Sequence, residues 1–272
     1  MALITITTAI GCGGMIVARR VADQLGIVLY DDNRLQQEAL KMGFTSEDMK
    51  SFDQTAPGFF TRLLKRRPAE YLELMASAVY EVARSGDGII VGNGAGYFLR
   101  DFGCALHLRV HAPEEFRIAR ITETRKVGEE EAKNLIRKAD SDLRGFLQSS
   151  FQMDLDDISL YDAIINVSKI GMESAASQIT AMAKTREIRE CSLSALEKME
   201  RLSLLKRVEA AALKNNIDIQ EMLFEVPEPG VVRITGMISP MRTVGGILEI
   251  VKSVPGVKQV ICEAEGHPLG EI

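Results

Sequence analysis

The stretch Leu3-Ile4-Thr5-Ile6-Thr7, followed closely by Gly11-Cys12-Gly13-Gly14, decides the fold of this chain. The first segment is rich in β-branched residues, which favour a strand. Apolar residues then recur at helical spacing up to Gly26, which suits the end of a helix. A glycine turn between a strand and a helix gathers free backbone N–H groups at the positive end of that helix. We therefore expect a phosphate-binding turn here.

Four more short apolar segments predict further strands, and helical patterns separate them. The segments are 27–30, 88–91, 105–110 and 162–167. Alternating strands and helices imply an α/β fold with a doubly wound, mostly parallel sheet, of the kind found in P-loop proteins. Ligands then bind at the carboxyl ends of the strands. A second glycine-rich turn, Gly92-Asn93-Gly94, follows the third strand at this edge.

The last part of the chain follows a different pattern. Segment 174–216 is helical and increasingly charged, and it is followed by strand patterns at 222–226, 231–236 and 259–262, with a helix over about 242–253. Together with the end of the preceding helix, the order is α-β-β-α-β. Because 272 residues exceed the usual size of one domain, we expect several parts. They are a P-loop-like domain (1–185), a helical connector (186–201) and a small α+β domain (202–265).

Composition is that of an ordinary soluble protein, with 46% apolar and 26% charged residues. A net charge of −5 favours neither nucleic acid nor an anionic membrane surface. No apolar stretch is long enough to span a membrane, and the amino terminus lacks the basic start of a signal peptide, so we expect a cytoplasmic protein. The cysteines are widely spaced, without a metal-ligand pattern, and are expected to be free thiols. They are Cys12, Cys104, Cys191 and Cys262.

The glycine turn departs from the usual pattern G-x-x-x-x-G-K-[ST]. Gly14 stands where the phosphate-binding lysine belongs, and the apolar Met15 and Ile16 follow where a metal-binding hydroxyl is normal. Neither function can be supplied from these positions. Phosphate binding would therefore depend on the backbone amides of residues 11–15.

In their order and spacing, several motifs over roughly residues 3–180 resemble the bacterial cytidylate kinase-like family. They are Ile4-Thr5-Ile6, Gly11-Cys12-Gly13-Gly14, Ala18-Arg19-Arg20, Leu25-Gly26, Tyr30-Asp31, Ile90-Val91-Gly92-x-Gly94-Ala95, Arg117-x-x-Arg120-Ile121, Lys138-Ala139-Asp140, Leu160-Tyr161-Asp162 and Asn166. This resemblance implies ATP-dependent phosphorylation of a nucleoside monophosphate, with a pyrimidine base expected. It also implies ATP and Mg²⁺ as the substrate complex.

Three positions depart from the family's pattern. The family commonly has G-S-G-G-R-E at the first turn, where this chain has Met15-Ile16 in place of the polar pair. A cation is lost at Asn93, where the family has G-R-G. The family's D-x-x-R becomes Asp140 with Arg144 shifted by one, which rotates the guanidinium by about 100° on a helix. A nucleotide-binding regulatory protein with weak or no catalysis therefore stands as the alternative, and a purely structural scaffold as a third possibility.

The resemblance implies roles for polar residues along the chain. Arg117, Arg120 and Arg125 would clamp phosphate as part of a lid, or else lie on a solvated helix face with Glu123 and the Glu129–Glu131 run. The expected catalytic set is Arg117, Arg120, Arg125, Asp140 and Arg144. The expected phosphate-binding set is Gly11, Cys12, Gly13, Gly14, Met15, Asp31, Gly92 and Gly94.

Other residues have two interpretations each. Asp31 could hold magnesium or orient an acceptor hydroxyl, or cap the following helix. Cys12 could be a thiol of low pKa at a helix start, or a small residue in place of serine. His107 and His111 favour packing over metal binding. A basic cluster fits a solvated helix face better than an acceptor site. It comprises Arg62, Lys65, Arg66 and Arg67.

The C-terminal part resembles the BON domain, a small bacterial module. The motifs are Val231-x-x-Ile234-x-Gly236 and Val254-Pro255-Gly256-Val257. This resemblance implies a phospholipid or protein partner, or a role in forming a homo-oligomer. No polybasic run accompanies the motifs, so membrane attraction would be weak.

Overall fold

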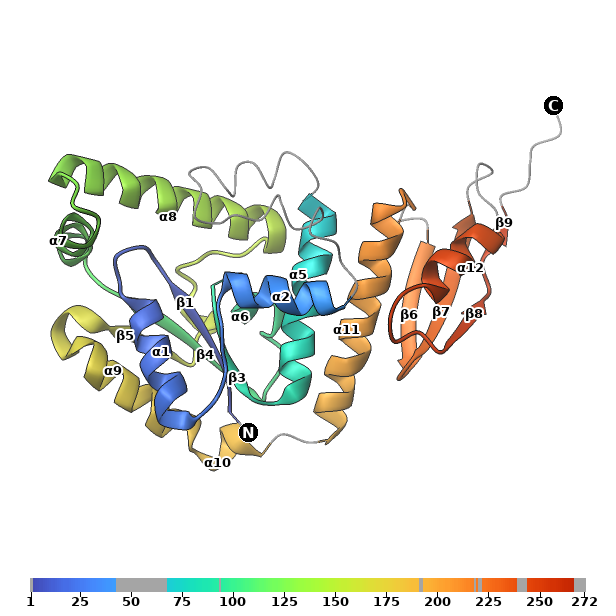
Figure 1. Cartoon of the computed structure of the whole chain (residues 1–272), viewed down its shortest axis with the longest axis horizontal. Helices are drawn as coiled ribbons and strands as arrows, with labels where there is room; N and C mark the ends of the chain where they lie inside the picture. Colours follow the sequence, from blue (N-terminus) through green and yellow to red (C-terminus); the bar gives the residue numbers. More distant parts are fainter. Residues whose placement is uncertain are drawn as a thin grey trace.

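The structure is a computed structural model that describes residues 2–42, 68–92, 94–190, 193–217, 219, 222–238 and 244–266. It contains a five-stranded sheet and a smaller second sheet. A long helix lies between the two sheets, and its buried side chains belong to the hydrophobic cores of both (Figure 1).

The larger sheet is parallel, as the alternation of strands and helices predicts, and its strand order is β2-β3-β1-β4-β5. Central strand β1 pairs with both β3 and β4, so that Thr5 lies between Ile90 and His107. The chain leaves β1 toward one side of the sheet and β4 toward the other, so the turns after these two strands meet at a switch point. The strands are β1 (Leu3–Thr8), β2 (Leu29–Tyr30), β3 (Gly88–Val91), β4 (Ala105–His111) and β5 (Ala163–Asn166).

Helices cover both faces of this sheet. On one face, α1 and α9 pack together over a core that includes Ile4, Val17 and Ile179. On the other face, α2, α5, α6 and the end of α8 share a second core that includes Leu35, Val79 and Leu147. The helices are α1 (Gly14–Leu25), α2 (Asp32–Lys41), α5 (Pro68–Ser85), α6 (Ala95–Phe98), α8 (Glu129–Phe151) and α9 (Val167–Ala183).

Two helices lie beyond the carboxyl ends of the strands. Helix α7 (Glu114–Arg125) follows β4 directly, and α8 runs across this edge of the sheet (Figure 1). A one-turn 3-10 helix, η1 (Ile158–Leu160), connects α8 to β5, and the short α10 (Arg186–Arg189) follows α9. Helix α8 therefore lies over the edge of the sheet at which the strands end (Figure 1).

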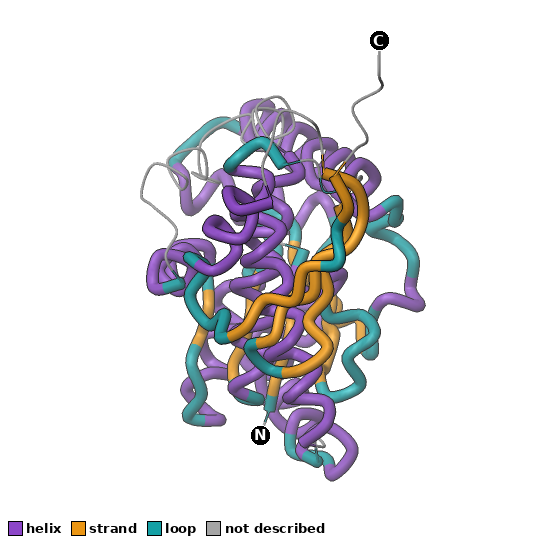
Figure 2. Tube along the Cα trace, turned by 90° about the vertical axis from the view of Figure 1, so that its right-hand side faces the viewer, coloured by secondary structure: helices purple, strands orange, loops and turns teal. Residues whose placement is uncertain are grey.

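The C-terminal elements occur in the order helix, two strands, helix, strand. Strands β6 and β7 are antiparallel, whereas β7 and β8 are parallel. Figure 2 views the molecule from this side and shows the small sheet in front of the helices. The elements are α11 (Leu193–Lys214), β6 (Met222–Glu228), β7 (Val231–Ile238), α12 (Val244–Lys252), β8 (Gln259–Cys262) and β9 (Glu265–Gly266).

Helix α11 belongs to two hydrophobic cores at once. Met199 is buried in the core of the large sheet, whereas Val208 and Ala212 are buried in the core of the small sheet. The helix is continuous across positions 201 and 202, where the sequence predicts the boundary between connector and C-terminal domain. Residues 193–214 thus form one continuous helix that contributes side chains to both cores.

Polar contacts between α5 and α11 accompany this packing. Lys206 Nζ lies 2.7 Å from both Glu73 Oε2 and Glu209 Oε2. Ser203 is fully buried, and its hydroxyl donates to Glu81 Oε2 at 3.0 Å. Burial raises the pKa of Glu73 to about 7, since the nearby Lys206 only partly offsets the cost of dehydrating the carboxylate.

We expect Glu73→Gln to stabilise the protein at pH 8, with a gain that shrinks toward pH 5. The folded state raises the pKa of this carboxyl, so its contribution to stability is present at low pH and is lost as the pH rises toward 7. Lys206 keeps Glu209 as its partner in the variant. Thermal unfolding across this pH range measures the difference. Glu81→Gln is the control, and it is expected to destabilise the protein at pH 8, opposite to Glu73→Gln. Burial opposes ionisation of Glu81, but Arg84 and Ser203 outweigh it and lower its pKa.

The described cysteines differ in their oxidation state. Cys12 and Cys262 are free, but Cys104 is disulfide-bonded, so the expectation of free thiols is wrong for this residue. Wide spacing in sequence does not reveal which cysteines a fold brings together. In the described ranges, no helix combines the length and the apolar character needed to cross a membrane.

Candidate functional site

The glycine turn lies between β1 and α1, at the switch point of the sheet. Gly11 and Gly13 have φ of 83° and 77°, which glycine tolerates and other residues rarely adopt. The Cys12 amide donates within the turn to Ala9 O at 3.2 Å. Among the described residues, the amides of Gly13, Gly14 and Met15 have no hydrogen-bond acceptor. Three of the expected amides are therefore available to an anion at the start of α1, whereas that of Cys12 is already used.

Gly14 is required by its neighbour, and this explains why no lysine stands there. A Cβ at position 14 would lie 2.5 Å from Thr8 Cβ, which is far inside van der Waals contact. Thr8 ends the central strand, so its backbone cannot easily move away. A lysine-bearing turn is incompatible with Thr8 in this position.

We expect Gly14→Ala to destabilise the protein by about 1–3 kcal/mol, because the added methyl group overpacks against Thr8. Gly14→Ala combined with Thr8→Gly should recover part of this loss. Gly145→Ala is the control, since nothing lies within 4 Å of a Cβ at that position in α8. The control should stabilise the protein by roughly 0.5–1 kcal/mol. Chemical denaturation measures all these changes, and an unaffected Gly14→Ala protein would contradict the packing argument.

Arg120 lies against the glycine turn. A Cβ at Gly13 would be 3.5 Å from Arg120 Cζ and 2.5 Å from Met172 Cε. No carboxylate of the described residues pairs with the Arg120 guanidinium. Met172 follows a kink at Gly171, where φ is 76°. A guanidinium and a thioether thus flank the turn at Gly13.

Arg117 is more buried than Arg120. The sequence allowed either a phosphate clamp or a solvated helix face for it, and its surroundings match neither description. Its Nε donates to Ile10 O at 2.8 Å, and its terminal nitrogens donate to both carboxylate oxygens of Asp140 at 2.8 and 2.7 Å. The side chain is only 8% exposed. The residue is not on a solvated face, and its guanidinium is already engaged by a carboxylate.

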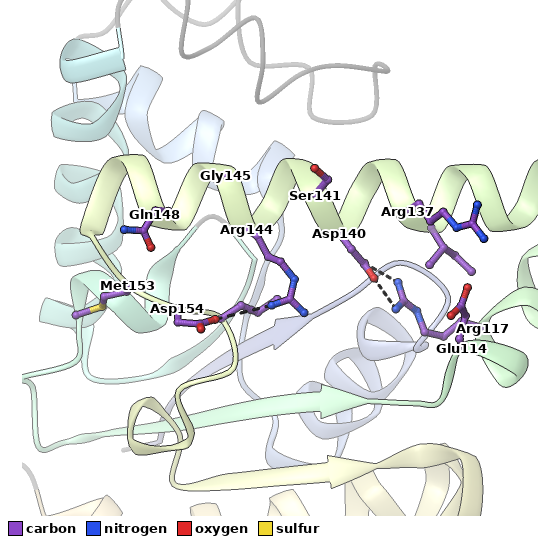
Figure 3. A pocket seen from close by; sticks show the side chains of 12 residues that line it. Glu114, Arg117, Arg137, Asp140, Ser141, Arg144, Gly145, Gln148, Met153 and Asp154 are labelled. Carbon is purple, nitrogen blue, oxygen red and sulfur yellow. Dashed lines mark hydrogen bonds and ion pairs between the residues drawn. The ribbon is translucent and has the colours of Figure 1, made fainter.

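A cavity of about 790 Å³ lies beneath α8 (Figure 3). Arg117, Asp140, Arg144 and Asp154 line it together with Arg137, which the sequence reasoning did not single out. Residues 137, 140 and 144 are spaced by three and four, so they share one face of the helix. This spacing was the available signal for Arg137. The same spacing keeps Arg144 in the cavity despite its shift from the family's position.

Arg144 is tied to the chain segment that follows α8. It pairs with Asp156, and its Nη1 is 3.8 Å from Asp154 Oδ1. Asp156 also accepts from Arg109 Nη2 at 2.7 Å, which links α8 to β4. The hydrogen bonds from Arg144 and Arg109 lower the pKa of Asp156. Arg125 is exposed at the end of α7 and does not line the cavity.

The two aspartates after β2 have separate surroundings. Asp31 Oδ1 accepts from Arg34 N at 3.0 Å, so Asp31 caps helix α2. Asp32 points toward the second glycine turn, since a Cβ at Gly92 would lie 3.9 Å from its Oδ1. At Gly94 a Cβ would meet the Phe151 ring at 3.0 Å. Gly94 is therefore needed for packing, and Gly92 faces the more open space.

Histidine and cysteine contribute to structure here. His107 is buried, its Nδ1 lies 2.8 Å from Thr5 Oγ1, and burial lowers its pKa. His111 is exposed at the end of β4. Burial raises the pKa of the Cys12 thiol, although the nearby Arg117 opposes this, so the idea of a thiol of low pKa is wrong. In the described part of the chain, no three His, Cys, Asp or Glu residues form a metal-binding group. The basic cluster at 62–67 lies outside the described residues.

The parallel sheet, the open amides at the start of α1 and the arginines above them define a protein of nucleotide kinase-like class. Comparison with known proteins agrees. The model of the cytidylate kinase-like family matches residues 3–169. The chain belongs to this family.

Curated relatives and solved structures resemble the same part of the chain. A cytidylate kinase of Pyrococcus horikoshii is 23% identical over 180 residues, which cover 66% of this chain and 86% of the relative. A cytidylate kinase of Desulfurococcus amylolyticus is 28% identical over 175 residues, covering 63% and 87%. The crystal structure of an uncharacterized protein from Eubacterium ventriosum superposes with a TM-score of 0.54 at 21% identity, covering 68% of this chain and 99% of that one. This structural likeness concerns the fold alone.

Proposed function

We propose that the protein transfers a phosphate from ATP to a nucleoside monophosphate, with a pyrimidine nucleotide such as CMP as the acceptor. The names of the curated relatives support this choice of acceptor. The observation that carries the proposal is the position of Arg120. Its guanidinium, which no carboxylate of the described residues pairs with, lies against Gly13, and the amides of residues 13–15 have no acceptor in the same part of the chain. A cation and a set of N–H donors thus converge without the usual lysine.

Each part of the site has a role in this reaction. The amides of Gly13, Gly14 and Met15 bind the donor phosphates at the positive end of α1. Arg120 neutralises charge that develops on the transferred group, and Arg137 and Arg144 contribute positive charge from the cavity side. Gly92 allows close approach beside β3, where a side chain would intrude.

Magnesium enters with ATP as part of the substrate. Mg²⁺ usually keeps several water ligands and needs only one or two carboxylates in addition to substrate phosphates. We assign this role to Asp32, because its Oδ1 would lie 3.9 Å from a Cβ at Gly92, directly after β3. Asp32 faces the open side of Gly92 at the strand edge.

A second function has support from specific observations. Arg117 and Arg144 are both paired with carboxylates, and residue 14 cannot carry a lysine. Fewer free cations weaken catalysis more than they weaken binding. The alternative is a nucleotide-binding regulatory protein with little or no turnover.

We further propose that residues 202–265 act as a BON-like module that binds a protein or phospholipid partner, or joins two copies of the chain. The observed helix-strand-strand-helix-strand order supports this proposal, as do the glycines at 236 and 256, which have φ of 108° and 98°. Because α11 contributes buried side chains to the cores of both sheets, a partner of this module could influence the nucleotide site.

The purified 272-residue chain can be tested directly. Calorimetric titration with ATP, CTP, CMP and a bisubstrate analogue measures binding, and ADP release in the presence of Mg²⁺, ATP and CMP measures turnover. Turnover with CMP supports the kinase. Micromolar binding of ATP without ADP release supports the regulatory alternative. If no nucleotide binds, both functions are excluded and the structural scaffold remains.

A further inference from the structure

Arg117 connects the glycine turn to helix α8. It reaches the Ile10 carbonyl, immediately before the turn, with Nε, and it holds Asp140 of α8 with both terminal nitrogens. Figure 3 shows the two side chains pointing at each other beneath α8. One guanidinium therefore spans two elements that are separate in sequence.

The backbone of Arg117 adds a second contact with the turn. A Cβ at Gly11 would lie 3.0 Å from both the Cβ and the carbonyl oxygen of Arg117. Gly11 therefore lets α7 rest directly on the turn. Since Arg117 begins in contact with the turn and ends at Asp140, the distance from turn to α8 is fixed through this residue.

The pairing also makes Arg117 a poor phosphate ligand. Both terminal nitrogens face a carboxylate, the side chain of Arg117 is 8% exposed and that of Asp140 is 28% exposed. Breaking such a largely dehydrated bidentate pair to contact phosphate would leave Asp140 facing a second anion. Arg120, one turn along α7, has no carboxylate partner in the described ranges and already lies against Gly13.

Asp140 lies between the other two arginines of the cavity. Arg137 and Arg144 are one turn before it and one turn after it on the same face of α8. When Asp140 is held in place, the distances of Arg137 and Arg144 from the glycine turn are held as well.

We infer that Arg117 and Asp140 are positioning residues. They hold the face of α8 that carries Arg137 and Arg144 at a fixed distance from the amides that bind the donor phosphate. This inference rests on the proposed function for its kinetic consequence, but its structural part does not. Misplacement of catalytic groups by about 1 Å can lower a rate by roughly 10²-fold. Loss of the pair should thus affect kcat far more than it affects ATP binding.

A double-mutant cycle tests the inference with Arg117→Met, Asp140→Asn and the combined variant. Each single change is expected to lower kcat with CMP by roughly 10- to 100-fold while the dissociation constant for ATP stays within about threefold. The combined variant should be no worse than the poorer single variant, because both changes remove one connection. Arg117→Lys keeps the positive charge but cannot donate two parallel hydrogen bonds to Asp140, so it should not restore kcat. Arg189→Met and Glu123→Gln, both exposed, serve as controls.

Two kinetic outcomes would overturn the inference. Arg117 contacts phosphate directly if Arg117→Met weakens ATP binding tenfold or more while Asp140→Asn leaves kcat unchanged or tightens ATP binding. Strictly additive losses, or full rescue by Arg117→Lys, would also show that the pair does not act as a unit.

Hydrogen exchange of the ligand-free protein separates this inference from the proposed function. Arg117→Met and Asp140→Asn should both speed amide exchange in residues 10–14 and in α8, whether or not the wild-type protein turns over CMP. Unchanged exchange in both regions would overturn the positioning role even in an active kinase. If both variants exchange faster but the wild-type protein releases no ADP, the kinase function is excluded and the structural role of the pair remains.

Discussion

Arg120→Met is expected to lower kcat/KM for ATP and CMP by about 10³-fold, since an arginine that stabilises a transferring phosphate contributes on this scale. The guanidinium lies against Gly13, and no carboxylate of the described residues competes for it. Position 14 carries no lysine, and the other arginine beside the turn, Arg117, is already engaged by Asp140. Steady-state ADP release as a function of ATP and CMP gives kcat and KM separately.

Arg189→Met provides the matched control, because this arginine is exposed on α10. Its kcat/KM should stay within about twofold of wild type. Arg120→Lys should retain part of the activity, since a compact charge replaces the planar fork. If Arg120→Met keeps wild-type kinetics, the cation that replaces the missing lysine is not Arg120.

Ile234→Ala is expected to destabilise the whole chain by about 2–5 kcal/mol, although it lies in the small sheet. Ile234 is fully buried in the core that α11 shares with β6, β7 and α12. The same helix is buried on its other side in the core of the large sheet through Met199. Loss of the small core should therefore lower the stability of both sheets together. Hydrogen exchange of β1 and β7 measures the two sheets separately.

Leu223→Ala on the neighbouring strand is the control, since that side chain is 58% exposed. Its effect should stay within about 0.5 kcal/mol. Two separate unfolding transitions in the Ile234→Ala protein, with unchanged exchange in β1, would show that α11 does not couple the sheets.

The strands of this protein could be predicted from sequence because each is short, apolar and bounded by a turn. The structure confirms the parallel α/β sheet and places strand β3 at the predicted residues 88–91. Strand β2 is shorter than its apolar pattern, because it lies at the edge and pairs with β3 alone. The glycine turn was predictable as well, because the backbone conformation of a tight strand-to-helix turn itself favours glycine.

The side-chain partners could not be predicted, because they depend on elements that meet only in the folded chain. The pair of Arg117 and Asp140 joins residues 23 apart on different helices. Position 14 excludes a side chain because Thr8 packs there, and the sequence shows only the missing lysine. The pKa of Cys12 rises through burial, which the sequence pattern of a helix start does not reveal.

Helix α11 also limits how this chain can be recombined with others. A chimera cut between residues 201 and 202 would divide a helix whose two faces are fitted to different sheets. Each residue inserted into the helix would turn one sheet relative to the other by about 100° and shift it by about 1.5 Å. A graft that keeps residues 193–214 whole, together with the α5 surface they contact, is the smallest exchange that preserves both fits.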